Sequence, residues 1–187
     1  MLENRRLRVA LAEAVTAAGI EVLAPASVAS VEAGPGLATV TLKDGRELKA
    51  PLVIGAEGRG STVRKAAKID TIGWAYQQSG VVATVKLGKP HGNVAHEYFL
   101  PDGPFAILPL TDQRASLVWT ESTRRAEALR GASDEAFHAH LMRRFGEFLE
   151  GVEVVGPRFV YPLSLQLAEK LTAPRMAIIG DAAHGVH

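Results

Sequence analysis

Two short segments, far apart in the sequence, place a carboxylate and glycines directly after an apolar run. Residues 53–64 (VIGAEGRGSTVR) carry Glu57 in a glycine-rich turn, and residues 178–187 (IIGDAAHGVH) carry Asp181. Glycines let a backbone approach a ligand closely, and a carboxylate just beyond a buried strand suits a ligand crevice at the carboxyl edge of a sheet. Both segments are therefore candidates for a ligand site.

Simpler explanations exist for the same residues. Ser61 fits the N-cap of a helix that follows the turn, a role that contributes about 1 kcal/mol. Asp181 could also be only an N-cap, and the spacing of Asp181, His184 and His187 would allow a metal site or a metal-dependent hydrolase. The three-glycine dinucleotide fingerprint is absent from the sequence. At this level the alternatives stay open.

Other polar and aromatic residues have structural roles as the default expectation. Lone histidines in strands and helices are usually structural; these are His91, His96, His138 and His140. Core packing is the default for Trp74, Tyr76, Phe99, Phe105 and Trp119. Solvated helix faces are the default for Arg124, Arg125, Arg130, Arg143 and Arg144.

Composition narrows the class of protein. The 187 residues have a net charge of +1, which argues against a partner held by bulk electrostatics, such as a nucleic acid. The absence of cysteine excludes disulfides, thiolate zinc sites and cysteine nucleophiles. No apolar run approaches the ~18 residues that cross a bilayer. These features predict a cytoplasmic globular protein.

The two ends of the chain predict an α/β layer. Apolar residues from Leu7 to Ala18 recur at helical spacing, and Gly19 ends that helix. Extended runs are expected at 20–23, 28–33 and 37–43, with Asp44-Gly45 closing a hairpin that ends at Leu48. Residues 52–56 and 176–180 lack polar alternation, which is typical of parallel strands buried on both faces.

The middle of the chain has a different pattern. Residues 81–87, 94–100 and 115–120 alternate with period two, which predicts an antiparallel meander. Two helices follow, the second with Ser133 as N-cap and an apolar side formed by Phe137, Leu141, Phe145 and Phe148. The predicted architecture is an α/β layer interrupted by an α+β insertion.

Taken together, these segments resemble the ubiquinone-biosynthesis hydroxylases, a branch of the flavin-dependent aromatic monooxygenases related to para-hydroxybenzoate hydroxylase. The matching motifs occur in the family's order and cover nearly the whole chain: Glu3-Asn4-Arg5, residues 55–64, Trp74-x-Tyr76-x-Gln78, GPFAILPL at 103–110, Val118-Trp119-Thr120, Tyr161-Pro162-Leu163 and GDAAH at 180–184. The ordered set is more specific than any single motif.

The resemblance implies a domain division. Residues 1–72 would form part of a Rossmann-like domain that binds FAD and NAD(P)H, and residues 166–187 would return to it. Residues 73–165 would form the inserted substrate-binding domain on an antiparallel sheet.

The resemblance also implies cofactor contacts. Asp181, with Gly180, would hydrogen-bond the FAD ribose. Glu57, Gly58 and Arg64 match a motif linked to both FAD and NAD(P)H, and Asn4 or Arg5 would lie near the cofactor. No catalytic residue is assigned by the match.

In this family NAD(P)H reduces FAD, and one atom of O₂ is transferred to an activated phenol. The implied substrate is a polyprenylated phenol, a quinone precursor. Association with pathway proteins or with the surface of the inner membrane is an expectation from the same resemblance.

The sequence departs from the family pattern in three places. Glu57 stands where the family usually has Asp, and neither the N-terminal glycine fingerprint nor the Gly-Gln-Gly expected after residue 187 is present. We therefore expect an internal fragment of a flavoprotein.

Nanomolar FAD binding needs about 12 kcal/mol, whereas one hydrogen bond from Asp181 supplies about 1.5–3 kcal/mol. This chain alone is therefore not expected to retain FAD. The alternative is a stand-alone binding or scaffolding module without redox chemistry.

Overall fold

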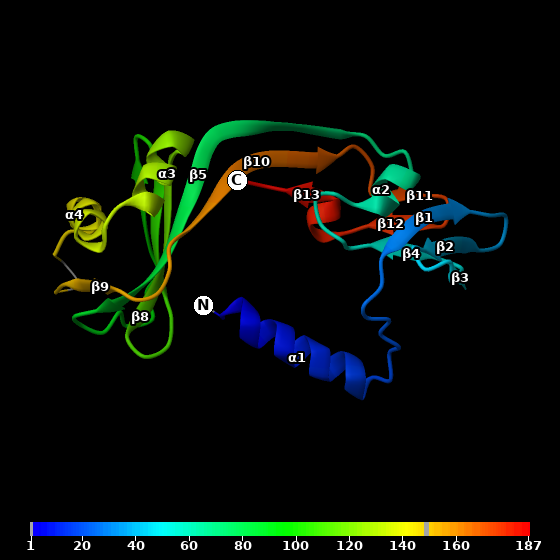
Figure 1. Cartoon of the computed structure of the whole chain (residues 1–187), viewed down its shortest axis with the longest axis horizontal. Helices are drawn as coiled ribbons and strands as arrows, with labels where there is room; N and C mark the ends of the chain where they lie inside the picture. The colour runs from blue at the N-terminus through cyan, green and yellow to red at the C-terminus, as the bar shows by residue number, and fades with distance from the viewer. Residues whose placement is uncertain (1, 148–149) are drawn as a thin grey trace. The chain divides into compact units, whose positions relative to one another are not determined.

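A computed structural model describes residues 2–147 and 150–187 (Figure 1). Phe148, predicted on the apolar side of the second central helix, lies outside the described residues. The helices are α1 (Asn4–Ala17), α2 (Thr62–Ala66), α3 (Thr123–Gly131), α4 (Asp134–Phe145) and the 3₁₀ helix η1 (Gly180–Ala182). The strands are β1 (Val28–Ala33), β2 (Ala38–Leu42), β3 (Glu47–Ala50), β4 (Val53–Gly55), β5 (Thr71–Leu87), β6 (His96–Leu100), β7 (Gly103–Pro109), β8 (Arg114–Ser122), β9 (Val152–Val154), β10 (Phe159–Ala168), β11 (Thr172–Ala173), β12 (Met176–Ile178) and β13 (His184–Gly185).

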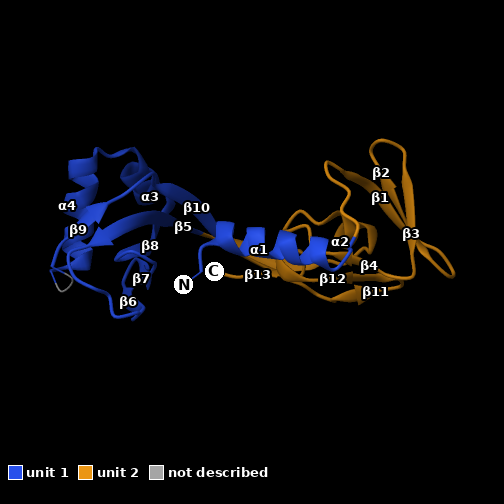
Figure 2. Ribbon diagram, turned by 90° about the horizontal axis from the view of Figure 1, so that it is seen from below, with its two compact units in different colours: residues 1–20, 77–163 blue, residues 21–76, 164–187 orange. Residues whose placement is uncertain are grey.

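The chain divides into two compact units, drawn in different colours in Figure 2. Unit 1 comprises Met1–Ile20 and Gln77–Leu163, and unit 2 comprises Glu21–Tyr76 and Ser164–His187. Strands β5 and β10 pass from one unit into the other, and the φ angle of Gln77, where β5 enters unit 1, is 56°. The binding roles predicted for residues 1–72, 73–165 and 166–187 stay predictions.

Unit 1 contains the predicted antiparallel meander. Its strands follow the order β6–β7–β8–β5, with Val82 opposite Val118 and Ala106 opposite the same Val118. Every second residue points to one face, where Phe105, Leu117 and other apolar side chains form a core with α3 and α4. The period-two pattern predicted runs in β5, β6 and β8, because only one face of the sheet is covered by helices. Strand β7, which pairs between β6 and β8, was not among the predicted runs.

Helix α4 forms for the reasons that the sequence indicates. The Ser133 hydroxyl accepts a hydrogen bond from the Ala136 N–H at 3.2 Å, which confirms the predicted N-cap. The side chains of Phe137, Leu141 and Phe145 are buried against the sheet. This helix therefore closes one face of unit 1.

Unit 2 contains two small sheets. Strands β1–β2–β3 form an antiparallel meander, and its hairpin turns at Gly45, whose φ is 89°. Strands β11–β12–β4 form the second sheet, in which β12 and β4 are parallel. Helix α2 contacts β4, β12 and β1, and a core cluster of Val31, Val63, Met176 and Ile178 lies among these elements.

Two expectations from the sequence are wrong. Residues 20–23 form no strand, since no other strand pairs with them in the described structure. The segment at 52–56 is not buried on both faces, because α2 covers only one face of its sheet and the side chain of Ile54 remains 55% exposed. Helix α1 forms as predicted, but its apolar residues Leu7 and Leu11 are exposed, since none of its residues packs into a core.

None of the described helices has the length and apolar character that crossing a membrane requires.

Candidate nucleotide site

The two segments singled out by their carboxylates lie side by side in unit 2. Strand β4 pairs with β12 in parallel, with Val53 opposite Met176 and Gly55 opposite Ile178 (Figure 1). The Ile179 N–H continues the ladder with a hydrogen bond of 2.9 Å to the Gly55 carbonyl. The loops that carry Glu57 and Asp181 therefore leave the same carboxyl edge of the sheet, the kind of position that was expected for each segment separately.

The turn after β4 is held by its own polar groups. Glu57 Oε1 accepts a hydrogen bond from the Val63 N–H at 2.8 Å, and Ser61 Oγ accepts one from the Arg64 N–H at 3.0 Å. Burial acts to raise the pKa of Glu57, but the Val63 N–H, the Ser61 hydroxyl and the neighbouring backbone outweigh it and lower the pKa below its usual value. Ser61 is thus the predicted N-cap, and Glu57 is kept ionised at the start of α2.

Arg64 connects the two segments. Its side chain is buried, and its Nη1 donates a hydrogen bond of 2.7 Å to the carbonyl of Ala182 in η1. Its Nη2 donates to the carbonyl of Arg59 in the turn before α2. A rigid planar guanidinium suits this role, since it donates in two directions at once. Arg64 was predicted to contact the cofactor. In the structure it links the two loops through these hydrogen bonds.

Arg59 was not predicted from the sequence. Its guanidinium donates to the Ser164 carbonyl at 3.2 and 3.3 Å and to the Ser164 hydroxyl. It also lies against Gly185, where a Cβ atom would come within 2.5–2.7 Å of the guanidinium atoms. A single arginine in a glycine-rich turn gives no signal of such partners, because Ser164 and Gly185 are more than 100 residues away in the sequence.

Asp181 is the exposed member of the site. Asp181 lies within η1, and the N-cap of this helix is Ile179. No side chain forms an N-cap hydrogen bond there, so the interpretation of Asp181 as an N-cap is wrong. Within the described residues its carboxylate has no hydrogen bond or ion pair. The preceding Gly180 has a φ of 57°, a left-handed conformation that glycine adopts without strain. This carboxylate is therefore available to a ligand.

The geometry gives no support to the metal alternative. Across residues 2–147 and 150–187, no three His, Cys, Asp or Glu side chains are grouped so that they could hold a metal ion. His184 lies in β13, paired with Leu167, and the ring of His187 is 4.8 Å from that of Tyr76.

Asn4 and Arg5 lie in the first turn of α1, with both side chains exposed. Arg5 is 3.6 Å from Glu3 within the same turn. Helix α1 is grouped with unit 1, whereas the other candidate residues belong to unit 2. Their place near a cofactor therefore stays a prediction.

Comparison with known proteins decides the family. The sequence model described as the FAD binding domain matches residues 1–187. The chain belongs to this family. FAD is accordingly the cofactor that the family binds, and NAD(P)H is its general reductant.

Its relatives confirm the resemblance to the ubiquinone-biosynthesis hydroxylases. Ubiquinone hydroxylase UbiL of Rhodospirillum rubrum is 44% identical over 191 residues, covering 100% of this chain and 44% of the relative. The 3-demethoxyubiquinol 3-hydroxylase of Escherichia coli is 35% identical over 188 residues, covering 100% of this chain and 48% of the relative. The chain thus spans less than half the length of either protein.

The fold is also similar to solved structures. PqsL of Pseudomonas aeruginosa, described as a probable FAD-dependent monooxygenase, superposes with a TM-score of 0.78 at 25% identity. The match covers 96% of this chain and 52% of PqsL. The mixed α/β fold with antiparallel sheets is therefore that of this group of flavoproteins.

Proposed function

We propose that this FAD-binding-family chain forms part of a flavin-dependent hydroxylase that acts on a polyprenylated phenol in ubiquinone biosynthesis, with NAD(P)H and O₂ as co-substrates. Support comes from the names of the relatives, which include a ubiquinone hydroxylase and a 3-demethoxyubiquinol 3-hydroxylase. Because the relatives are more than twice as long, the activity is proposed for the full-length protein that carries this chain.

The exposed carboxylate of Asp181 is the observation that carries the proposal. It has no partner among the described residues, and it follows β12 directly beside the turn after β4. Such a position suits hydrogen bonds from the two hydroxyls of a ribose, which donate to an ionised carboxylate. Asp181 and Gly180 would therefore hold the FAD ribose.

The remaining residues of the site would position that contact. Glu57, held ionised by the Val63 N–H, shapes the turn in which Gly58 adopts a φ of 83°. Arg64 fixes this turn to the loop of Asp181 through the Ala182 carbonyl. When bound, FAD supplies the chemistry of oxygen transfer, and these residues orient it; Asn4 and Arg5 are proposed contacts from α1.

For the inserted substrate domain, we propose the sheet of unit 1. Helices α3 and α4 cover one of its faces. The opposite face presents the half-buried side chains of Val82, Ala106 and Val118, which are neighbours across β5, β8 and β7. An apolar face of this kind suits a prenyl chain. Association with pathway proteins or with the inner membrane surface would deliver so apolar a substrate.

The test compares the full-length protein with two variants, Asp181→Asn and Asp70→Asn. Asp70 is an exposed carboxylate of the same unit and serves as the matched control. We expect the unmodified protein and the control to bind FAD and to oxidise NAD(P)H. The Asp181 variant should bind FAD roughly 10- to 100-fold more weakly, the value of one charge-assisted hydrogen bond.

If both variants bound FAD with equal affinity, Asp181 would not be a residue that contacts FAD. If the unmodified protein bound a polyprenylated phenol but no FAD, the proposed hydroxylase activity would be wrong and a binding module would take its place.

A further inference from the structure

The half-buried side chain of Arg59 joins the turn before α2 to strand β10. Its Nη1 and Nη2 donate hydrogen bonds to the Ser164 carbonyl at 3.3 and 3.2 Å, and Nη1 also donates to the Ser164 hydroxyl. A contact in the reverse direction comes from Gln166 Nε2, which donates to the Arg59 carbonyl at 3.3 Å. Two residues of β10 therefore hold this turn.

The Arg59 guanidinium also lies against β13. This short strand pairs with β10, with the buried Gly185 opposite Gln166. A Cβ atom on Gly185 would come within 2.5–2.7 Å of the guanidinium atoms. The φ of Gly185 lies outside the left-handed region, so the backbone itself does not require glycine there. What the missing side chain provides is room for Arg59.

The segment that carries Asp181 is thereby fixed from two sides. Arg64 donates to the carbonyl of Ala182, one residue after Asp181, and Arg59 lies against Gly185 a few residues further on. Both arginines extend from the same short region around the start of α2. Because the Asp181 carboxylate has no partner of its own among the described residues, its position depends on these neighbouring contacts.

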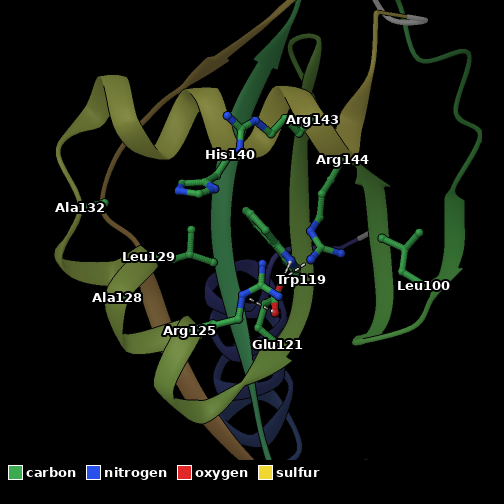
Figure 3. A pocket seen from close by; sticks show the side chains of 10 residues that line it. All are labelled: Leu100, Trp119, Glu121, Arg125, Ala128, Leu129, Ala132, His140, Arg143 and Arg144. Carbon is green, nitrogen blue, oxygen red and sulfur yellow. Dashed lines mark hydrogen bonds and ion pairs between the residues drawn. The ribbon is translucent and has the colours of Figure 1, made fainter.

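Two arginines of unit 1 are held in a different way. They line a pocket of about 610 Å³ between the sheet and the helices α3 and α4, where Arg125 and Arg144 form ion pairs with the buried Glu121 (Figure 3). Arg59 makes no ion pair within the described residues, and its acceptors are neutral oxygen atoms. A planar guanidinium with such acceptors fixes a position, since it donates in defined directions.

We propose that Arg59 is a positioning residue, which sets the place of the Asp181 carboxylate by holding the turn before α2 against β10 and β13. The inference rests on the proposed contact between Asp181 and the FAD ribose, and it names the residue that orients this contact. The competing role is electrostatic, because the positive charge of Arg59 could attract the diphosphate of FAD directly. That role would need the charge but not the contact with Gly185.

The test measures the FAD affinity of the full-length protein by flavin fluorescence. Arg59→Met keeps the length of the side chain and removes the donors to Ser164, so it should weaken FAD binding about tenfold. Lys65→Met removes a positive charge from an exposed position of α2 and should change the affinity less than about twofold. Hydrogen exchange without FAD should be faster at residues 181–185 in Arg59→Met only.

Gly185→Ala separates position from charge. The added methyl group displaces the guanidinium, while the positive charge of Arg59 remains. This variant should therefore weaken FAD binding about as much as Arg59→Met. Gly36→Ala is the matched control, since Gly36 has an ordinary φ and no atom within 4 Å of the position of a Cβ, and it should leave FAD affinity unchanged.

A double-mutant cycle separates positioning from general stability. In the Asp181→Asn background, Arg59→Met should change FAD affinity less than about twofold, because the contact that Arg59 positions is already lost. A residue that only stabilised the fold would cause the same loss in both backgrounds. Thermal unfolding of each variant ensures that affinity is measured on folded protein.

Additive losses in the cycle, unchanged hydrogen exchange in Arg59→Met, or full FAD affinity in Gly185→Ala would overturn the inference and leave the proposed ribose contact standing. Unchanged FAD affinity in Asp181→Asn alone would overturn both, since there would be no contact to position.

Discussion

The two units of this protein are stabilised in different ways. In unit 1 the helices α3 and α4 close one face of an antiparallel sheet that includes β5, β6, β7, β8 and β9, and the aromatic rings of Phe105, Trp119 and Phe137 lie in a continuous core. In unit 2 the sheet that carries the candidate site has three short strands and a smaller apolar cluster. Its connections are instead polar, and they centre on the guanidinium groups of Arg59 and Arg64.

This difference shows how the edge proposed to bind a ligand is held with little apolar core. Asp181 is exposed at this carboxyl edge, and the loops there are fixed by hydrogen bonds to backbone carbonyls. Unit 1 buries most of the helix-covered face of its sheet. If the two units are stabilised in these different ways, substitutions should destabilise them by different mechanisms.

The largest effect is expected from a change in the core of unit 1. Phe137→Ala removes a ring that is 1% exposed and 6.0 Å from the Trp119 ring, and should lower the free energy of unfolding by about 3–5 kcal/mol. Denaturant titration measures the change, and hydrogen–deuterium exchange locates it in unit 1. Phe99→Ala is the control, since Phe99 is 83% exposed, and should alter stability by less than about 0.5 kcal/mol. Similar losses in both variants would contradict a core on the helix side alone.

A smaller effect is expected when the polar connection of unit 2 is cut. Arg64→Met keeps the length of the side chain but removes the donors to the carbonyls of Ala182 and Arg59, and should cost about 2–3 kcal/mol. Faster hydrogen exchange should appear in both η1 and the turn before α2. Lys65→Met, an exposed neighbour on the same helix, should leave exchange unchanged. Exchange that rises in only one of the two loops would show that Arg64 does not couple them.

The smallest effect concerns the ionisation of Glu57. Because hydrogen bonds lower its pKa in the folded protein, its contribution to stability is present above the unfolded pKa of about 4.3 and is lost as the pH falls through the folded value. Glu57 is exposed, so the contribution should be below about 1 kcal/mol. Unfolding titrations at pH 6 and near pH 3 should show a smaller acid-induced loss for Glu57→Gln than for the unmodified protein. Glu32→Gln, at an exposed position of β1, is the control. If Glu32→Gln reduced the acid-induced loss of stability as much as Glu57→Gln, the lowered pKa of Glu57 would not be the cause.

The pocket of unit 1 shows where default expectations from sequence fail. Arginines on helices were expected to be solvated, yet the side chain of Arg144 is only 16% exposed and is paired with the fully buried Glu121. Helical spacing could not reveal this pair, because Glu121 lies on a strand more than 20 residues earlier. For Phe99 the error is the reverse: its side chain was expected in a core, and it is exposed.

Local chemistry was sufficient for the helices α1 to α4 and for the alternating strands β5, β6 and β8, but not for β7, β9 or β10. Ser61 and Ser133 cap the helices that they were expected to cap, and the alternating runs form the meander. These features depend on neighbours a few residues away, and the sequence contains that information directly. Each of the two candidate segments was expected at the carboxyl edge of a sheet, and they share one edge because β4 and β12 pair in parallel.

Only the tertiary structure showed which polar side chains form hydrogen bonds and which have no partner. Glu57 is engaged by Val63, Arg64 by Ala182 and Arg59 by Ser164, whereas Asp181 and Arg143 have no partners among the described residues. Side-chain partners are chosen by three-dimensional proximity, which the order of residues along a chain does not state. The same limit explains why the outer face of β4 was expected to be buried: an apolar run shows which residues could be buried, but only packing shows whether anything covers them. Helix α1 likewise has apolar residues at helical spacing, and none of them is buried.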